Sequence, residues 1–398
     1  MSSQAVIGVV GTFDSKGEEH FFLKEAIERR GYGCLTIHVG TKGPPAFPPD
    51  LDLGSRAQEG TGRDQAIAAV IERARAKVQG LYRDGKIRGI ISAGGGTGTY
   101  LGTSIMKALP LGVPKVMVST VASRDMSRTV GIHDITVIHS VADLLGVNSI
   151  SGMILDVAAG AVCGMAQRTW EPSQGKKKVA LTLFGFITQG AEAVKACLDE
   201  MGYEVIAFHA NGTGGMAMEE LAAAGHFDGI LDLALHEMAD RMFDGYCGGI
   251  GPQRLEPVRG RSVPRLVVPG GLDCAVLEFT REAIPEEHKG RKLFFYDFRS
   301  AIRLNEAESV RLAQEVAEKL NRYREPVRVL IPRGGWSEAD GPEGPLYDPE
   351  VSAAFVRELR GGLGPGIPVE EVDFHINGRA FAEQAARRMH EMITGGQG

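Results

Sequence analysis

Short apolar runs rich in β-branched residues alternate along this chain with longer segments in which apolar residues recur at helical spacing. The short runs are nearly continuous in hydrophobic character, as strands are when helices cover both faces of a sheet. This alternation predicts an α/β architecture with mostly parallel sheets. In the first half we expect strands at 5–10, 34–38, 89–92, 115–119 and 136–139, and helices at 17–30, 63–84, 99–108 and 149–167.

The alternation restarts after the stretch 171–178, which is rich in proline, glycine and lysine and has no apolar period. Such a composition is typical of a domain boundary. We therefore expect two domains, residues 1–175 and 176–398. The second should hold strands at 179–184, 204–209, 229–233, 265–268, 293–296, 327–331 and 368–373, with its clearest helices at 306–323 and 378–392.

The two halves share local features that point to an internal duplication. Segments 10–18 and 184–191 each connect an expected strand to an expected helix. Both helices end at a Gly-Tyr pair, and both following strands end in a histidine, His38 and His209. We predict two Rossmann-like domains related by duplication. The alternative is that all strand–turn–helix–strand units look alike.

Charge and cysteine content narrow the class of function. The net charge of −6 argues against a general nucleic-acid binder, which needs a basic face, although an acidic chain can still bind a nucleotide locally. The five scattered cysteines are typical of reduced thiols in the cytoplasm, not of a disulfide or zinc framework. No signal peptide and no long uninterrupted apolar run occurs, so we expect no membrane partner.

A four-glycine turn at 92–99 follows the apolar run 87–91 and precedes a segment of helical character. Backbone without Cβ atoms can approach a phosphate closely, and the N–H groups at a helix start favour an anion. A second glycine turn, 211–215, follows a strand in the other half. The alternative is that these glycines serve only close packing of helices on strands.

Loops at the carboxyl ends of parallel strands gather at one edge of a sheet, where ligands of α/β proteins bind. Neither GxxxxGK[ST] nor GxGxxG occurs in its full context, which argues against a Walker-A ATPase and a standard NAD site. Hydroxyl groups and the Lys16 ammonium group are nevertheless suited to phosphate. The expected nucleotide-binding residues are Gly11, Thr12, Asp14, Lys16, Gly17, Gly94, Gly95, Gly96, Thr97, Gly98, Thr99, Ser119, Thr120, Asn211, Gly212, Thr213 and Gly214.

A set of motifs spread over the whole chain resembles the Tm-1-like ATP-binding family, also called UPF0261. The motifs are GTFDSKGEE at 11–19, SAGGGTGT at 92–99, VGIHDIT at 130–136, NGTGG at 211–215, PGGLD at 269–273 and IPRGGWSEAD at 331–340. Each motif alone is unspecific, but the combination is specific. The resemblance implies two Rossmann-like subdomains, ATP as the bound nucleotide, and a homodimer or higher homo-oligomer.

A magnesium nucleotide usually needs one or two protein carboxylates and leaves its other positions to water and phosphate. Asp14 and Asp125 are the expected Mg²⁺ ligands, with Asp134 as a third candidate. The alternative for each is an ordinary solvated loop residue or helix cap.

The second half contains the candidate acid–base residues. His236 and Asp240 lie at i and i+4, as in a zincin helix with Asp in place of the second histidine, but no third ligand stands at a recognisable spacing. We therefore interpret His236, Glu237 and His209 as acid–base groups, and Arg333 as an anion clamp, in a second polar cleft. That cleft would bind a small acidic or carbonyl substrate. The alternative function is a non-catalytic, nucleotide-dependent regulatory or binding dimer.

Overall fold

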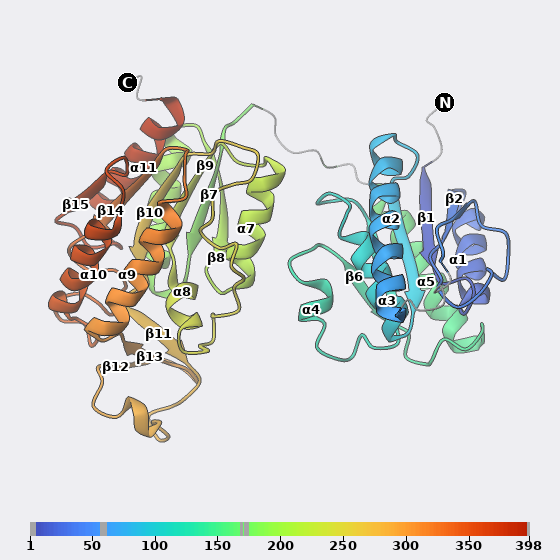
Figure 1. Ribbon diagram of the computed structural model, residues 1–398, viewed down its shortest axis with the longest axis horizontal. Coiled ribbons are helices and arrows are strands. Elements are labelled where there is room, and N and C mark those ends of the chain that lie inside the picture. The colour runs from blue at the N-terminus through green and yellow to red at the C-terminus, as the bar shows by residue number, and fades with distance from the viewer. Residues whose placement is uncertain (1–4, 56–61, 168–169, 171–174, 396–398) are drawn as a thin grey trace. The chain divides into compact units, whose positions relative to one another are not determined.

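The computed structural model describes residues 5–55, 62–167, 170 and 175–395 (Figure 1). The chain divides into two compact units, residues 1–172 and 173–398. Each unit is an α/β layer structure built on a six-stranded parallel sheet, as the hydrophobic pattern predicts. None of the helices that the structure describes is long and apolar enough to cross a membrane.

In the first unit the strand order is β3-β2-β1-β4-β5-β6. Helices α1 and α5 pack on one face of this sheet, and α2 and α3 pack on the other, so the strands are buried on both sides. The strands are β1 (Val6–Gly11), β2 (Gly33–His38), β3 (Leu51–Asp52), β4 (Gly89–Gly94), β5 (Lys115–Ser119) and β6 (Thr136–His139). The helices are α1 (Gly17–Arg29), α2 (Arg63–Arg83), α3 (Gly96–Met106), α4 (Ser127–Val130) and α5 (Ser149–Met165).

In the second unit the order is β15-β14-β10-β9-β7-β8. Helices α6 and α11 cover one face, while α7, α9 and α10 cover the other. The strands of this sheet are β7 (Lys178–Leu183), β8 (Glu204–His209), β9 (Gly229–Ala234), β10 (Arg265–Gly270), β14 (Val327–Pro332) and β15 (Val369–Val372). The helices are α6 (Thr188–Glu200), α7 (Thr213–Ala224), α8 (His236–Arg241), α9 (Glu306–Leu320), α10 (Pro349–Gly362) and α11 (Arg379–Thr394), with short 3₁₀ turns η1 (Gly185–Ile187) and η2 (Glu286–His288).

One expected strand of the parallel sheet lies elsewhere. Residues 293–296 contribute β12 (Leu293–Phe295), which belongs to a separate antiparallel sheet of order β11-β13-β12, with β11 (Cys274–Leu277) and β13 (Ser300–Arg303). No helix separates β10 from β11 or β12 from β13, and a parallel crossover needs about a dozen residues, usually a helix. The small sheet therefore forms from local antiparallel pairs at one end of the main sheet (Figure 1).

The two main sheets share a strand order once the edge strands β3 and β15 are set aside. The first runs β2-β1-β4-β5-β6 and the second β8-β7-β9-β10-β14, so that β1 corresponds to β7 and β4 to β9. This common order supports the predicted duplication. It also shows that the two glycine turns, which we expected in equivalent positions of the two halves, are not equivalent. The 211–215 turn follows β8 and so corresponds to the end of β2, whereas the four-glycine turn corresponds to the start of α8 at His236.

Candidate functional site

The first unit has a pocket of about 310 Å³ at the carboxyl edge of its sheet. Strands β1 and β4 are neighbours there, but the chain leaves β1 toward β2 on one side and continues from β4 to β5 on the other. Ligands of open α/β sheets bind at such a switch point. The lining residues are Thr12, Asp14, Ser15, Lys16, Thr41, Lys42, Arg63, Gly95, Gly96, Thr97, Gly98 and Leu101.

The four-glycine turn leads directly into α3, which begins at Gly96, earlier than the expected residue 99. The first turn of the helix therefore consists of Gly96, Thr97 and Gly98, and it contains no acidic side chain. The first N–H groups of a helix have no partner within the helix, and the helix dipole favours an anion at this end. The turn thus offers the pocket backbone donors and a positive potential.

The glycines of this turn differ in the space around them. A Cβ atom at Gly94 would lie 2.8 Å from Cα of Gly98, so packing alone requires glycine there. A Cβ atom at Gly95 would lie at an ordinary 3.7 Å from Oγ1 of Thr120, and one at Gly96 would meet no described atom within 4 Å. Neither residue has a positive φ. Packing in the described structure therefore does not explain Gly95 and Gly96, whereas close approach of a ligand would.

Asp14 lines the pocket with a partly unsatisfied carboxylate. Its Oδ2 accepts hydrogen bonds from the backbone N–H groups of Lys42 (2.7 Å) and Gly43 (3.2 Å). Its Oδ1 is buried and has no hydrogen-bond partner among the described residues. The carboxylate is thus fixed by the backbone and keeps one acceptor atom for a cation or a ligand hydroxyl.

His20, which the sequence interpretation missed, connects the two loops of the pocket. Its Nδ1 lies 2.6 Å from the carbonyl oxygen of Lys16, and its Nε2 accepts from the N–H of Ala93 at 3.3 Å. Burial lowers the pKa of His20 to about 4. A neutral ring has one donor and one acceptor, which matches these two contacts. The sequence feature that could have identified His20 is its position four residues, or about one helical turn, after Lys16.

Two expected binding glycines are needed for packing. A Cβ atom at Gly11 would overlap the ring of His20, and one at Gly17 would lie 2.5 Å from Cβ of Ala46. Neither lines the pocket, whereas their neighbour Thr12 does. These glycines shape the loop after β1 and leave the contacts with a ligand to the residues between them.

Some of the hydroxyl residues expected at the pocket make structural contacts instead of lining it. Oγ1 of Thr99 and Oγ of Ser119 are buried and lie 2.7 Å apart. The N–H of Thr120 donates to the carbonyl of Gly94 at 3.2 Å. These three residues stabilise the junction of β4, α3 and β5, whereas Thr97 lines the pocket.

Three cationic side chains line the pocket; one is held by protein contacts and two are exposed. The ammonium group of Lys16 donates to the carbonyl of Leu144 and lies 3.9 Å from Glu19, so it is already engaged. Lys42 and Arg63, by contrast, are exposed. The latter two are therefore the cations that can move toward an anionic ligand.

The other two candidate magnesium ligands lie away from this pocket. Asp125 is exposed and accepts from the N–H of Ser127 at 2.8 Å, just before α4. Asp134 pairs with Lys115 at 2.7 Å, and Lys115 begins β5, at the edge of the sheet opposite the glycine turn. Of these aspartates, Asp14 is the one that the structure places at the pocket.

The second glycine turn is explained by its own backbone. Gly212 has a φ of +92°, and a Cβ atom at Gly214 would lie 2.1 Å from the carbonyl oxygen of His209. Oδ1 of Asn211 accepts from the N–H of Gly214 at 3.2 Å and from the hydroxyl of Thr213 at 3.4 Å. The side chain of Asn211 therefore already occupies the helix start that an anion would use.

The second unit has a larger pocket, of about 530 Å³, beside the loop after β14. Arg333 lies at this pocket, with its Nη1 3.2 Å from Asp373. Arg360 donates to Glu371 at 2.6 Å. The pocket is lined by Ile331, Arg333, Gly334, Gly335, Trp336, Asp340, Tyr347, Pro349, Ser352, Ala353, Val356, Arg357, Arg360, Glu371 and Asp373.

A carboxyl group with a perturbed pKa lies at the wall of the larger pocket. Burial, and then the neighbouring Asp273, raise the pKa of Asp340 to about 7, against the opposing effect of Arg303. Oδ2 of Asp340 accepts from the N–H of Trp336 at 3.0 Å, and Asp273 accepts from the hydroxyl of Ser337 at 2.8 Å. A carboxyl group that titrates near neutrality can donate or accept a proton, so Asp340 joins Arg333 as a candidate site residue.

The four residues expected to act together in catalysis are not gathered at this pocket. His209 is exposed at the end of β8, while His236 and Glu237 are fully buried and do not line the pocket. His236 is turned toward Gly271 and Asp240. Glu237, the next residue along, is instead held by Arg254 at 2.7 Å.

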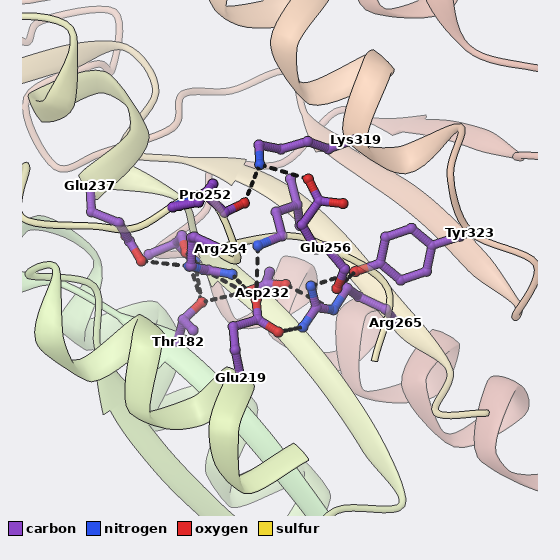
Figure 2. A network of polar contacts seen from close by, with 12 residues as sticks. Thr182, Glu219, Asp232, Glu237, Pro252, Arg254, Glu256, Arg265, Lys319 and Tyr323 are labelled. Atoms are coloured by element: carbon purple, nitrogen blue, oxygen red, sulfur yellow. Dashed lines mark hydrogen bonds and ion pairs between the residues drawn. The ribbon is translucent and has the colours of Figure 1, made fainter. Parts of the chain in front are cut away.

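Glu237 belongs to a buried charge network, shown in Figure 2, that joins the sheet to the layer around α7. Arg254 donates to Glu237, to Glu219 at 3.0 Å and to Asp232 at 2.6 Å. Arg265 donates to the other oxygen of Glu219 at 2.6 Å. Burial raises the pKa of Glu237, and its ion pair with Arg254 opposes that shift. These contacts give Glu237 a structural role.

Fold and pocket together define the chain as a two-unit, Rossmann-like α/β protein with a pocket at the switch point of its first sheet. Family models of the "Uncharacterised protein family (UPF0261)" match both halves, the N-terminal domain over residues 5–171 and the C-terminal domain over residues 176–393. The chain therefore belongs to the UPF0261 family, and the resemblance inferred from its motifs is confirmed.

Two relatives identified by sequence agree with this assignment. A UPF0261 protein of Clostridium tetani is 35% identical over 97% of this chain and 98% of its own length. The ToMV resistance protein Tm-1(GCR237) of Solanum lycopersicum is 35% identical over 94% of this chain and 54% of its own length. The solved structure of UDP-N-acetylglucosamine 2-epimerase from Rickettsia bellii aligns over 98% of this chain and 96% of its own, with 10% identity and a TM-score of 0.23.

Proposed function

We propose that the first unit binds ATP and holds its phosphates at the start of α3. The observation that carries this proposal is that Gly95 and Gly96 line the pocket although the fold itself would tolerate a Cβ atom at both positions. The backbone N–H groups of the first turn and the exposed cations Lys42 and Arg63 supply donors and positive charge. The pocket volume of about 310 Å³ suits a phosphate chain.

Asp14 fits a role as the protein ligand of Mg²⁺ on the nucleotide. Its Oδ1 is buried at the pocket wall and has no hydrogen-bond partner in the described part of the chain, while Oδ2 is fixed by two N–H groups. Magnesium usually takes one or two carboxylates and completes its shell with water and phosphate oxygens. The ion would neutralise phosphate charge, and Asp14 would orient it.

Isothermal titration calorimetry of Gly96→Val tests the phosphate site. The side chain would project into open space, so the variant should fold, but it would block the approach of a phosphate to the N–H groups. We expect the affinity for MgATP to fall at least tenfold, or about 1.4 kcal/mol. Gly80→Val, in α2, is the matched control, because Gly80 also has no described neighbour within 4 Å. Equal affinities in folded Gly96→Val and wild type would refute the assignment of this turn.

A second proposal concerns the pocket at Arg333. Arg333, Arg357 and the titratable carboxyl group of Asp340 suit a small acidic or carbonyl compound. If the protein is an enzyme, incubation with ATP and such compounds yields ADP, AMP or pyrophosphate. A chain that binds ATP and forms none of these across a broad panel is instead a nucleotide-dependent binding protein. The homodimer implied by the family resemblance stays a prediction, which light scattering would check.

A further inference from the structure

Three side chains with metal-binding atoms converge inside the second unit. His236 and Asp240 lie one turn apart on α8, and Cys247 follows in the turn after that helix. Their ligand atoms all lie within 4.8 Å of one another, and each residue is buried. The sequence showed the first two at helical spacing, but Cys247 stands at no recognisable spacing, because a non-helical turn returns it to the helix.

The ring of His236 is oriented as the ring of a metal ligand is. Its Nδ1 lies 3.1 Å from the carbonyl oxygen of Gly271, and Phe184 stacks on it at 4.2 Å between ring centroids. A hydrogen bond from Nδ1–H to a carbonyl fixes the tautomer and leaves the lone pair on Nε2. Nε2 is buried without a hydrogen-bond partner among the residues described.

Asp240 is also held in place by backbone donors. Its Oδ1 accepts from the N–H of Val276 at 2.7 Å, and its Oδ2 from the N–H of Cys247 at 2.8 Å. Hydrogen bonds of this kind orient the carboxylates that bind metals. They also leave Oδ1 facing Nε2 of His236 at 3.2 Å, so that two acceptor atoms meet in a dry interior unless a proton or a cation lies between them.

The distance between these atoms helps to decide between a proton and a cation. A charge-assisted N–H···O hydrogen bond is usually about 2.7–2.9 Å long. Two ligand atoms each about 2.0 Å from a tetrahedral ion lie roughly 3.3 Å apart. The observed 3.2 Å is closer to the second value and lies at the long end of ordinary N–H···O hydrogen bonds. The sulfur of Cys247 lies within 4.8 Å of both atoms and is therefore available as a third ligand.

We propose that the second unit binds a zinc ion through Nε2 of His236, a carboxylate oxygen of Asp240 and the thiolate of Cys247. Mixed nitrogen, oxygen and sulfur ligands in a tetrahedral arrangement select Zn²⁺ over Mg²⁺ or Ca²⁺. With these three ligands, the carboxylate and the thiolate balance the two positive charges of the ion, so the three-ligand site is neutral in a buried environment. On binding, the thiol of Cys247 loses its proton to solvent.

The fourth position has a candidate next to His236, outside the cluster of three. Cys274 begins β11, is buried, and its thiol interacts with the imidazole of His236. A fourth ligand from Cys274 would close the site, which is typical of structural zinc and not of a catalytic centre. The ion would then tie α8, the turn at Cys247 and β11 together. This role is independent of nucleotide binding in the first unit.

The test uses the full chain purified from zinc-supplemented medium without a metal-affinity step. We expect roughly one zinc per chain by elemental analysis and, after exchange for Co²⁺, the d–d and thiolate charge-transfer bands of a tetrahedral site. Cys247→Ala should lose the charge-transfer band and most of the metal. Cys197→Ala, which removes a buried thiol from α6 in the same unit, should retain both.

The wild-type measurements do not depend on whether a variant folds. A metal-free wild type whose melting temperature is unchanged by zinc or by a chelator would overturn the proposal. The same holds if Cys197→Ala and Cys247→Ala lose metal equally. His236 and Asp240 would then form a buried ion pair, and ¹⁵N NMR of the imidazole would show both of its nitrogens protonated.

Discussion

At the scale of single residues, His20 stabilises the pocket of the first unit because one neutral ring contacts both of the loops that form it. It donates to the carbonyl of Lys16 after β1 and accepts from the N–H of Ala93 in β4. Protonation would replace the acceptor with a second N–H that faces a backbone N–H. The geometry of the pocket therefore depends on His20 remaining neutral.

This dependence predicts how stability changes with pH. The pKa of His20 falls from 6.5 to about 4 on folding, because burial disfavours the charged ring. Between these values the unfolded chain binds a proton that the native chain does not, so stability falls as the pH drops through this window. The loss between pH 7.5 and 5 should be about 2 kcal/mol.

Urea unfolding followed by circular dichroism at the two pH values checks this expectation. The variant His20→Gln cannot titrate in the window, so its stability should change with pH by about 2 kcal/mol less than that of the wild type. Parallel pH dependences for the two proteins would show that His20 is charged in the native state or already neutral when unfolded.

At the scale of elements, the buried charges around Arg254 join strands and helices that the hydrophobic pattern predicts only separately. Asp232 lies on β9, Glu219 on α7 and Glu237 on α8, and the guanidinium group of Arg254 binds all three (Figure 2). No periodicity in the sequence marks these residues as partners, because each belongs to a different element.

Replacing Arg254 should therefore cost far more than replacing an exposed arginine. Arg254→Met leaves three carboxylates without their shared cation, and removing one partner of a buried pair typically destabilises by about 3–5 kcal/mol. Arg322→Met, which breaks half-exposed pairs with Glu256 and Glu318, should cost less than about 1 kcal/mol. Denaturant midpoints measure both changes. A similar small cost for the two variants would mean that the network adds little to stability.

Helices and strands that follow the period of hydrophobic residues could be predicted from the sequence. Strands that are defined by pairing with a neighbouring strand could not. The parallel strands and the long helices follow from hydrophobic period, so β4 and α9 were expected close to their observed positions. The strands β11 and β13 were missed, because each is short and is defined by its antiparallel partner. The sequence also cannot distinguish Gly95 from Gly212, since both stand in glycine-rich turns. Only the structure shows that Gly212 needs its positive φ, whereas the fold would tolerate a side chain at Gly95.

At the scale of the whole molecule, each unit has its own sheet, its own core and its own proposed site. The pocket of the first unit is lined by residues between 12 and 101, and the three proposed zinc ligands lie between 236 and 247, so each proposed ligand would contact one unit. A ligand that binds only the native state raises stability by RT ln(1 + [L]/Kd). At one hundred times Kd this is about 2.7 kcal/mol for the unit that binds.

Differential scanning calorimetry should therefore resolve two transitions that respond to different ligands. MgATP should raise the melting temperature of one transition by a few degrees, at roughly 2–4 °C per kcal/mol for units of this size. Zinc removal should lower the other. The variants assign the two transitions, because Gly96→Val should weaken the response to MgATP by about half or more and keep the response to zinc. Cys247→Ala should lose the response to zinc and keep the response to MgATP. If both ligands instead shift a single transition, the two units unfold together as one cooperative body. Each ligand then stabilises both units.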